Sequence, residues 1–343
     1  MPKLLEAARN PLAHVAQRWT PDPRTVQRAA LTALVMSLVI VVTGGAVRLT
    51  GSGLGCDTWP KCTGDSLVVT SEMGVHGVIE FGNRMLTYVL CAAVGWVIVA
   101  ARSARPGRPG LTRLAWAQFW IVMGNAVLGG ITVLTGLNPY IVAAHFLLAT
   151  TLITVAAVTW QRSREGDSPP RPLAGVPVRR AVAALAVVNA ALIVAGTAVT
   201  GTGPHAGDPG EIARMPFDWE RISQVHAALA WMAVLGTLAV WALLRLVDAP
   251  RGPRARTRDL FLLLMSQGVI GYAQYFLQVP EVLVGLHMLG SVLVWVAMVR
   301  LLLSLRGRGP VPGTEDTGPP AGADPEPAAG RPDRASLVGS SRP

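Results

Sequence analysis

The chain has 343 residues, a formal net charge of +10, 51% hydrophobic residues and only 15% charged residues. So low a charged fraction excludes an ordinary soluble domain and indicates a polytopic membrane protein. The arginines lie in short loops between apolar runs, which is the pattern of membrane topology, so nucleic acid is excluded as a partner.

Residues 1–28 are polar and basic and lack a small-residue cleavage site, so they are expected to be a cytoplasmic segment and not a removable signal peptide. Eight apolar runs follow, each close to the ~20 residues that a helix needs to cross a bilayer. Very short turns at 136–139 and 278–280 predict two tight helical hairpins. Residues 305–343 have no apolar period and predict a disordered cytoplasmic tail. The apolar runs cover 29–49, 74–101, 113–136, 139–161, 180–200, 219–244, 259–279 and 281–304.

The loops between these runs differ in their content of lysine and arginine. Loops 102–113, 162–180 and 245–258 are rich in arginine, whereas the loops 50–73 and 201–218 hold few basic residues. The positive-inside rule therefore places both termini in the cytoplasm and these last two loops outside the plasma membrane.

The chain also repeats itself. Residues 29–161 and residues 180–304 each hold four apolar runs, and His145 coincides with His287 when the halves are superimposed in sequence. Chance similarity between apolar helices explains such a match less well than duplication does. The expected fold is therefore all-α, with eight transmembrane helices arranged as two pseudo-symmetric four-helix bundles.

The second run, 74–101, carries the polar residues His76, Glu80, Asn83 and Arg84. At about 100° per residue these four side chains share one helix face. A charge near the middle of a bilayer helix costs at least ~2.5–3.5 kcal/mol, so two charges need an internal, partly wet site. Glu80 and Arg84 stand at i and i+4 in the favourable order, and a purely structural ion pair is the alternative to a functional site.

Histidines mark a second candidate site. His145, His226 and His287 each lie six to eight residues into a helix that starts on the outer side, so they share one depth. Two neutral imidazoles facing each other in a helical bundle are the usual axial ligands of a six-coordinate haem, so His226 and His287 predict such a site. Zinc is disfavoured because no cysteine or carboxylate completes four ligands. His76 could be a ligand, a bridge to Glu80 or an interfacial residue.

Cysteines are few. Cys56 and Cys62 flank the segment DTWPK in an outer loop, where a disulfide is expected more than a metal site. A redox-active pair is the alternative, because disulfides in small exposed loops tend to be labile. Cys91 lies within the second helix and is expected to be a small apolar core residue.

Five motifs occur in one order within residues 29–304: GGAVRLTGSGLGCDTWPKC, IEFGNR, AAHF, QVHAALAW and GLHMLG. Together they resemble the haem A synthase family, membrane enzymes that make haem A from haem O. The resemblance implies that the C-terminal half binds a haem b cofactor, with His226 and His287 as iron ligands. It also implies that the N-terminal half binds the substrate haem, with Glu80 as the catalytic residue and His145 as a ligand of the substrate iron.

The sequence departs from the family pattern at two places. Asn83 stands where the family has a histidine, as in an actinobacterial-type variant, so the substrate iron would be held by His145 alone or with His76 as a substitute. The second outer loop lacks the second cysteine pair that some members carry, which leaves Cys56 and Cys62 as the expected disulfide.

The chemistry that the resemblance implies is oxidation of a methyl group of haem O to a formyl group by two successive hydroxylations, in haem A biosynthesis for cytochrome oxidase. A carboxylate could stabilise positive charge at that carbon or orient water, which is the role expected of Glu80, with Arg84 tuning it. Arg48 is a candidate partner for haem propionates, and an interfacial anchor is its alternative role.

The expected partners are haem O, a haem O synthase that supplies it, an electron acceptor that the sequence does not identify, the lipid bilayer and a second copy of the chain. An electron carrier of the cytochrome b type without haem-modifying activity is the alternative function. A carrier would more naturally show matched histidine pairs in both halves and no buried carboxylate. A transporter built on repeats would explain the duplication but not the histidines at one depth.

Overall fold

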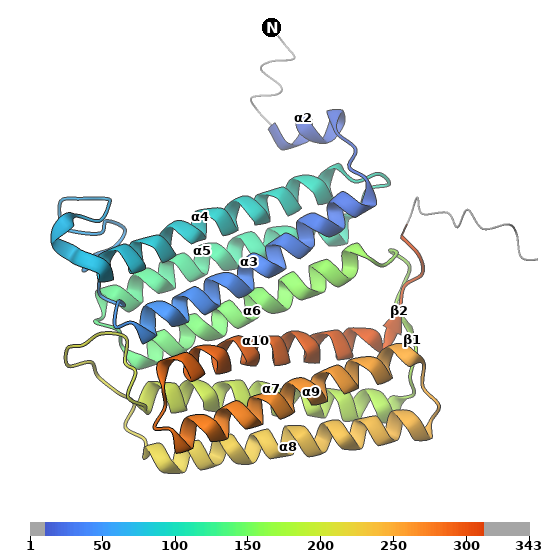
Figure 1. The fold of residues 1–343 in the computed structure, drawn as a ribbon. Coiled ribbons are helices and arrows are strands. Elements are labelled where there is room, and N and C mark those ends of the chain that lie inside the picture. The colour runs from blue at the N-terminus through green and yellow to red at the C-terminus, as the bar shows by residue number, and fades with distance from the viewer. Residues whose placement is uncertain (1–10, 312–343) are drawn as a thin grey trace, which may run out of the picture. The chain divides into compact units, whose positions relative to one another are not determined.

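Eight long helices dominate residues 11–311, the part of the chain that the computed structural model describes (Figure 1). A short helix, α2 (Pro11–Arg18), precedes them, and the 3-10 turn η1 (Ser71–Met73) leads into α4. Seven of the long helices are apolar enough to cross a membrane, which confirms an all-α polytopic membrane protein. The long helices are α3 (Pro23–Leu49), α4 (Gly74–Ser103), α5 (Pro109–Leu134), α6 (Pro139–Ser163), α7 (Val176–Thr202), α8 (Trp219–Leu246), α9 (Arg251–Phe276) and α10 (Glu281–Ser304).

Helix α9 is the exception among the eight. Its first turns are rich in arginine, and Ser266, Gln267 and Gln274 interrupt the apolar residues that follow. This composition leaves α9 outside the set of helices that qualify as membrane spans, so a count of eight spans stays a prediction.

Several helices begin earlier than the apolar runs predict. Helix α3 begins at Pro23 and not at residue 29, because Asp22 caps it: the Asp22 Oδ1 accepts a hydrogen bond of 2.7 Å from the N–H of Arg24. Proline at the first helical position adds to this signal, since its missing N–H would have no partner there. Helix α9 likewise begins at Arg251 and not at residue 259. The length of an apolar run corresponds to the thickness of the bilayer's hydrocarbon core, whereas the helix itself continues through polar turns on either side.

The long helices pack in two groups, α3–α6 and α7–α10, and each helix lies against its neighbours along the chain (Figure 1). Helix α10 also packs against α3 and α6, and α6 packs against α7, so a seam joins the two groups. The buried core of this seam includes Val41, Ile153 and Val292. The assignment of one group to the substrate and of the other to a cofactor stays a prediction.

The two predicted hairpin turns are present, and both use left-handed backbone conformations. In the turn between α5 and α6, Gly136 and Leu137 both have φ of 58°. In the turn between α9 and α10, Gln278 and Val279 have φ of 59° and 61°. Such angles are unfavourable for residues other than glycine, so surrounding contacts must hold them. The side chain of Leu137 is buried and fills the space left by Gly53 in the loop between α3 and α4.

The chain does not leave the folded unit directly after α10. Strand β2 (Arg306–Gly307) pairs antiparallel with β1 (Arg171–Pro172), which lies between α6 and α7. Residues 305–307, which were predicted to belong to the tail, are therefore held in the folded unit by backbone hydrogen bonds. Residues 1–10 and 312–343, where the rest of the two predicted terminal segments fall, lie outside the described residues.

Candidate functional site

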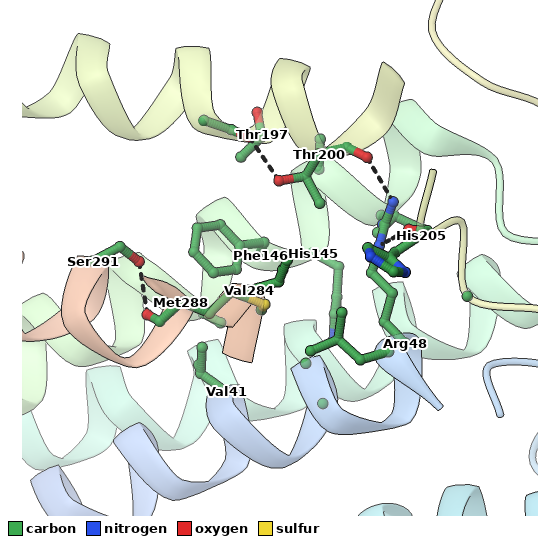
Figure 2. A pocket seen from close by; sticks show the side chains of 18 of the residues that line it. Val41, Arg48, His145, Phe146, Thr197, Thr200, His205, Val284, Met288 and Ser291 are labelled. Atoms are coloured by element: carbon green, nitrogen blue, oxygen red, sulfur yellow. Dashed lines mark hydrogen bonds between the residues drawn. The ribbon is translucent and has the colours of Figure 1, made fainter. Parts of the chain in front are cut away.

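A cavity of about 1520 Å³ extends into both helix groups and is lined by α3 to α10 and by the loops that join α3 to α4 and α7 to α8. Its volume exceeds the ~300–1,000 Å³ of common small-molecule pockets, so it has room for a large macrocycle. Figure 2 shows part of the lining, with Arg48, His145 and His205 contributed by different segments. Seven of the eight predicted site residues other than the cysteines line this cavity: Arg48, Glu80, Asn83, Arg84, His145, His226 and His287.

Glu80 is a buried carboxylate with 6% of its surface exposed. Its Oε2 accepts a hydrogen bond of 2.6 Å from the backbone N–H of Cys56. Its Oε1 accepts hydrogen bonds of 2.6 Å and 3.1 Å from Nη2 and Nε of Arg84, so the predicted ion pair is present. Hydrogen bonds that involve a charged group are the stronger kind, so these donors hold both carboxylate oxygens in place at the cavity wall.

Arg84 also holds the loop between α3 and α4 over the cavity. Its guanidinium donates to the backbone carbonyls of Cys56, Thr58 and Lys61. Cys56 and Cys62 form the predicted disulfide within this loop, and both are fully buried. The Glu80–Arg84 pair therefore has a structural task, holding the loop, in addition to any chemical one.

Trp59 places the same loop against α5. A Cβ atom built on Gly130 would overlap the indole ring of Trp59, so only glycine leaves room for the ring at this position. Both residues line the cavity. The indole therefore closes part of the cavity at the end where the loop between α3 and α4 lies, a contact that nothing in the sequence pattern singled out.

This contact predicts opposite effects for two glycine substitutions in α5. Gly130→Ala should lower the thermal stability of the protein, because overpacking against Trp59 costs about 1–3 kcal/mol. Gly124→Ala is the matched control: its new Cβ would lie 3.5 Å from Leu148, an ordinary contact, and alanine gains about 0.5–1 kcal/mol over glycine in a helix. Melting of both variants, followed by circular dichroism, measures the difference. Adding Trp59→Ala to Gly130→Ala should restore part of the loss, and the absence of such coupling would contradict the contact.

His145 of α6 and Asn83 of α4 both line the cavity in the first helix group. The ring of His145 lies against Gly129 of α5, where a Cβ would be 3.1 Å from its Cε1. Asn83 lies near Gly44 of α3, and its Oδ1 accepts a hydrogen bond of 2.8 Å from the hydroxyl of Thr43. Asn83 therefore has a protein partner that the sequence analysis did not identify.

His226 in α8 and His287 in α10 face each other, with ring centroids 6.2 Å apart and ring planes at 65°. The two rings lie against Gly196 and Gly271, where a Cβ would be 3.2 Å and 3.5 Å from the respective Cε1 atoms. Each of these histidines thus lies opposite a glycine of the preceding helix, as His145 does. The glycines let the helices approach closely where the imidazoles project into the cavity.

The residues present fit a haem held by the second helix group. A centroid separation near 6 Å suits two imidazoles that bind one metal ion from opposite sides with metal–nitrogen bonds of about 2.0–2.1 Å. Nδ1 of His287 and Nδ1 of His145 are buried with no hydrogen-bond partner among the described residues. No cluster of three or more His, Cys, Asp or Glu that could hold a bare metal ion occurs within residues 11–311. The metal site that these side chains support is therefore one in which two histidines bind an ion that a macrocycle also holds.

Arg48 connects the two helix groups from the last turn of α3. Its Nε donates to the carbonyl of His205 at 2.7 Å, and its Nη2 donates to the carbonyl of Thr200 at 2.9 Å (Figure 2). These bonds hold the last turn of α7 and the start of the loop between α7 and α8. Arg48 also lines the cavity, so its expected role toward a propionate stays a prediction beside this structural one.

His76 is the predicted site residue that does not line the cavity. It is exposed, and its Nδ1 lies 2.9 Å from the hydroxyl of the buried Ser52. The bridge to Glu80 considered from the sequence is not formed, because Glu80 is bonded to Cys56 and Arg84 instead. His76 therefore anchors the loop between α3 and α4 to the start of α4.

Asn125 in α5 and Gln267 in α9 are two further cavity residues that coincide in the sequence repeat. Their side-chain oxygens, Oδ1 and Oε1, are both buried without a hydrogen-bond partner among the described residues. Their equivalent positions were visible in the sequence, but nothing in the sequence indicated that both would face the cavity.

Comparison with known proteins gives one family match and several curated relatives. A family model described as cytochrome oxidase assembly protein (COX15-CtaA) matches residues 27–207, which is more than half of the chain. This range contains Glu80 and His145 but neither His226 nor His287.

Curated relatives are named heme A synthase. Those of Listeria welshimeri serovar 6b and Lysinibacillus sphaericus are 30% identical over 146 residues and 31% identical over 130 residues. The matches cover 39% and 38% of this chain, and 46% and 41% of the relatives. A relative from Alkalihalophilus pseudofirmus is 27% identical over 141 residues, which is 39% of this chain and 46% of the relative. The chain therefore spans less than half the length of these curated relatives.

Proposed function

This chain belongs to the COX15-CtaA family of cytochrome oxidase assembly proteins, and from that premise we propose that it is a haem A synthase. One observation carries the proposal: a buried carboxylate, Glu80, and the imidazole of His145 line the same cavity as the His226–His287 pair. A binding site with two unlike ends suits an enzyme that modifies one haem while it holds another.

In this proposal His226 and His287 are the iron ligands of a resident haem b. Haem b supplies one-electron redox chemistry when it is bound. Both histidines project from membrane helices and lie against glycines, so their rings are positioned before any haem arrives. This preorganisation lowers the entropic cost of binding the macrocycle.

The substrate is haem O, and its oxidation is proposed to proceed in two hydroxylations. In the first, a ring methyl group and water give an alcohol as two electrons and two protons leave. In the second, the alcohol and water give a geminal diol, with the same loss. The diol then releases water and leaves the formyl group. The electrons pass to an acceptor that remains to be identified.

Glu80 is the proposed catalytic residue in these steps. Its ionised carboxylate would stabilise the positive charge that develops at the oxidised carbon, or orient the attacking water and take up its proton. The N–H of Cys56 and the guanidinium of Arg84 hold both carboxylate oxygens in place, so the group needs little reorganisation during reaction. His145 would bind the substrate iron, with Asn83 beside it as a polar contact. Arg48 is the proposed partner of a haem propionate at the outer end of the cavity.

The loop between α3 and α4, which holds the Cys56–Cys62 disulfide and is called the disulfide loop below, would exclude bulk water from this chemistry together with its Trp59. The loop lies at the end of the helices away from β1 and β2 (Figure 1). In the proposed topology this end faces the outside of the cell membrane, and both termini lie on its cytoplasmic side. A haem O synthase in the same membrane would deliver the substrate. The proposal also includes association of two copies of the chain.

The pigments bound to purified protein test the function. Haem b accompanied by haem O and haem A, identified by chromatography of the extracted pigments, is the expected result. Haem b alone would favour the cytochrome b-type electron carrier. Protein that contains no haem would overturn both readings and favour a transporter.

A further inference from the structure

Two arginines enclose one tryptophan at the end of the helices opposite the disulfide loop. The guanidinium carbons of Arg164 and Arg300 lie 5.1 Å and 5.2 Å from the ring centroid of Trp160. Trp160 and Arg164 belong to the end of α6 and Arg300 belongs to α10, so this Trp160 cluster bridges the two helix groups. It lies far along the helices from the cavity and none of its members lines it.

The two arginines lack partners that other arginines nearby possess. Neither Arg164 nor Arg300 has a side-chain hydrogen bond or salt bridge within residues 11–311, and Nε of Arg300 is buried without a partner. In contrast, Arg108 and Arg162 both pair with Asp167 at 2.7 Å and 3.0 Å. A guanidinium offers five donors in a fixed plane, so the unpaired arginines leave a strong anion-binding capacity unused.

The surroundings of the cluster add positive charge rather than balance it. Arg300 interacts electrostatically with Arg164 and Arg256 and with one acidic residue, Asp259. Asp259 is already engaged, since it pairs with Arg256 at 3.7 Å and with Arg258 at 3.0 Å. The cluster is therefore a local excess of cations at the end of the seam.

Trp160 also connects the cluster to apolar surface. Its ring packs, half-buried, against the seam core, together with the partly buried Val158 and Trp295. Tryptophan at the end of a membrane helix is typical of the level of the lipid headgroups. A ligand in this place would thus meet cations at one end and apolar side chains at the other.

We propose that the Trp160 cluster binds the phosphate of an anionic phospholipid headgroup at the seam between the two helix groups. Arg164 and Arg300 would each donate to phosphate oxygens while their planes remain stacked on the indole. The apolar residues beside Trp160 would contact the first part of an acyl chain. Basic pockets between membrane helices bind such headgroups, whereas a free phosphate would have no use for the apolar contact.

The experiment uses the full chain in nanodiscs of dioleoylphosphatidylcholine with increasing fractions of dioleoylphosphatidylglycerol. Melting temperature and the lipid that remains bound in native mass spectrometry are the two readouts. The wild-type protein should gain stability as the anionic fraction rises and retain phosphatidylglycerol selectively. Inorganic phosphate, added to protein in phosphatidylcholine alone, tests the other source of the same anion and should give no such gain.

Substitutions then locate the site. A hydrogen bond from a guanidinium to the bound phosphate contributes about 1 kcal/mol, or about five-fold, to retention of that one lipid, so Arg164→Gln and Arg300→Gln together should weaken selective retention roughly 20- to 30-fold. Arg164 is exposed, so Arg164→Gln alone should fold and lose about five-fold. Arg245→Gln is the matched control, because Arg245 lies 5.7 Å from the ring of Trp241 and no second arginine of the described residues stacks on that ring. It should leave the preference within about two-fold of the wild type.

Three outcomes overturn the proposal. The first is a wild-type protein with no preference for phosphatidylglycerol. The second is an equal loss in the Arg245→Gln control, which would reduce the effect to general surface charge. The third is full stabilisation by inorganic phosphate, which would make the cluster a site for a soluble anion.

Discussion

Replacing Glu80 with glutamine should leave a folded protein that binds haem b and haem O but forms at least about 100-fold less haem A. General acid–base groups contribute about 10²–10⁴-fold to rates, and loss of a charge stabiliser acts on the transition state more than on binding. Glutamine keeps the shape and one acceptor oxygen, so it can retain either the Cys56 contact or the Arg84 contact. Glu80→Asp should recover part of the activity, limited by its shorter reach. Chromatography of haem O and haem A from membranes that express each variant measures the effect.

The structure makes a strict control necessary, because Glu80 also helps to hold the disulfide loop. Arg84→Gln removes the ion pair and three loop contacts but leaves the carboxylate and its bond from Cys56. A catalytic Glu80 predicts that Arg84→Gln keeps clearly more activity than Glu80→Gln. A purely structural pair predicts equal losses, poor expression and haem loss in both, and rescue of Glu80→Gln when Arg84 is neutralised as well. Normal haem A production by Glu80→Gln would end the catalytic assignment.

Removal of either axial histidine should have the second large effect. His226→Ala and His287→Ala should each abolish the low-spin absorption spectrum of haem b, because a six-coordinate iron then loses one ligand. Visible spectra of the purified, reduced variants measure the loss.

Two other histidines are controls for this experiment. His145→Ala should keep the low-spin haem b spectrum but lose haem O, since His145 lies against Gly129 in the other helix group. His205→Ala should keep both pigments, because the Nε2 of His205 is engaged with the carbonyl of Val279 at 2.8 Å. An unchanged spectrum in both His226→Ala and His287→Ala would show that the ligand assignment is wrong.

The sequence alone determined the helical class, the approximate helices and the tight turns, because these features depend on local composition. A run of about 20 apolar residues is long enough to cross a bilayer. The polar residues that interrupt such runs, Glu80 and the histidines, were equally evident, since a buried polar group in a membrane helix is costly and requires a reason. The first turns of α3 and α9 were missed because they are polar and lie outside the apolar runs.

The tertiary structure alone decided how these residues come together. Most of these membrane helices are apolar on all sides, so the periodicity that marks the buried face of a soluble helix is weak. Where no polar residues mark a face, the sequence does not predict which face turns inward. The bond from Cys56 to Glu80 joins residues 24 positions apart, and Arg48 reaches carbonyls 152 and 157 positions away. The contact of Trp59 with Gly130 depends on the absence of a side chain in another helix. Such contacts arise from the packing of distant segments, and no local pattern in the chain encodes them.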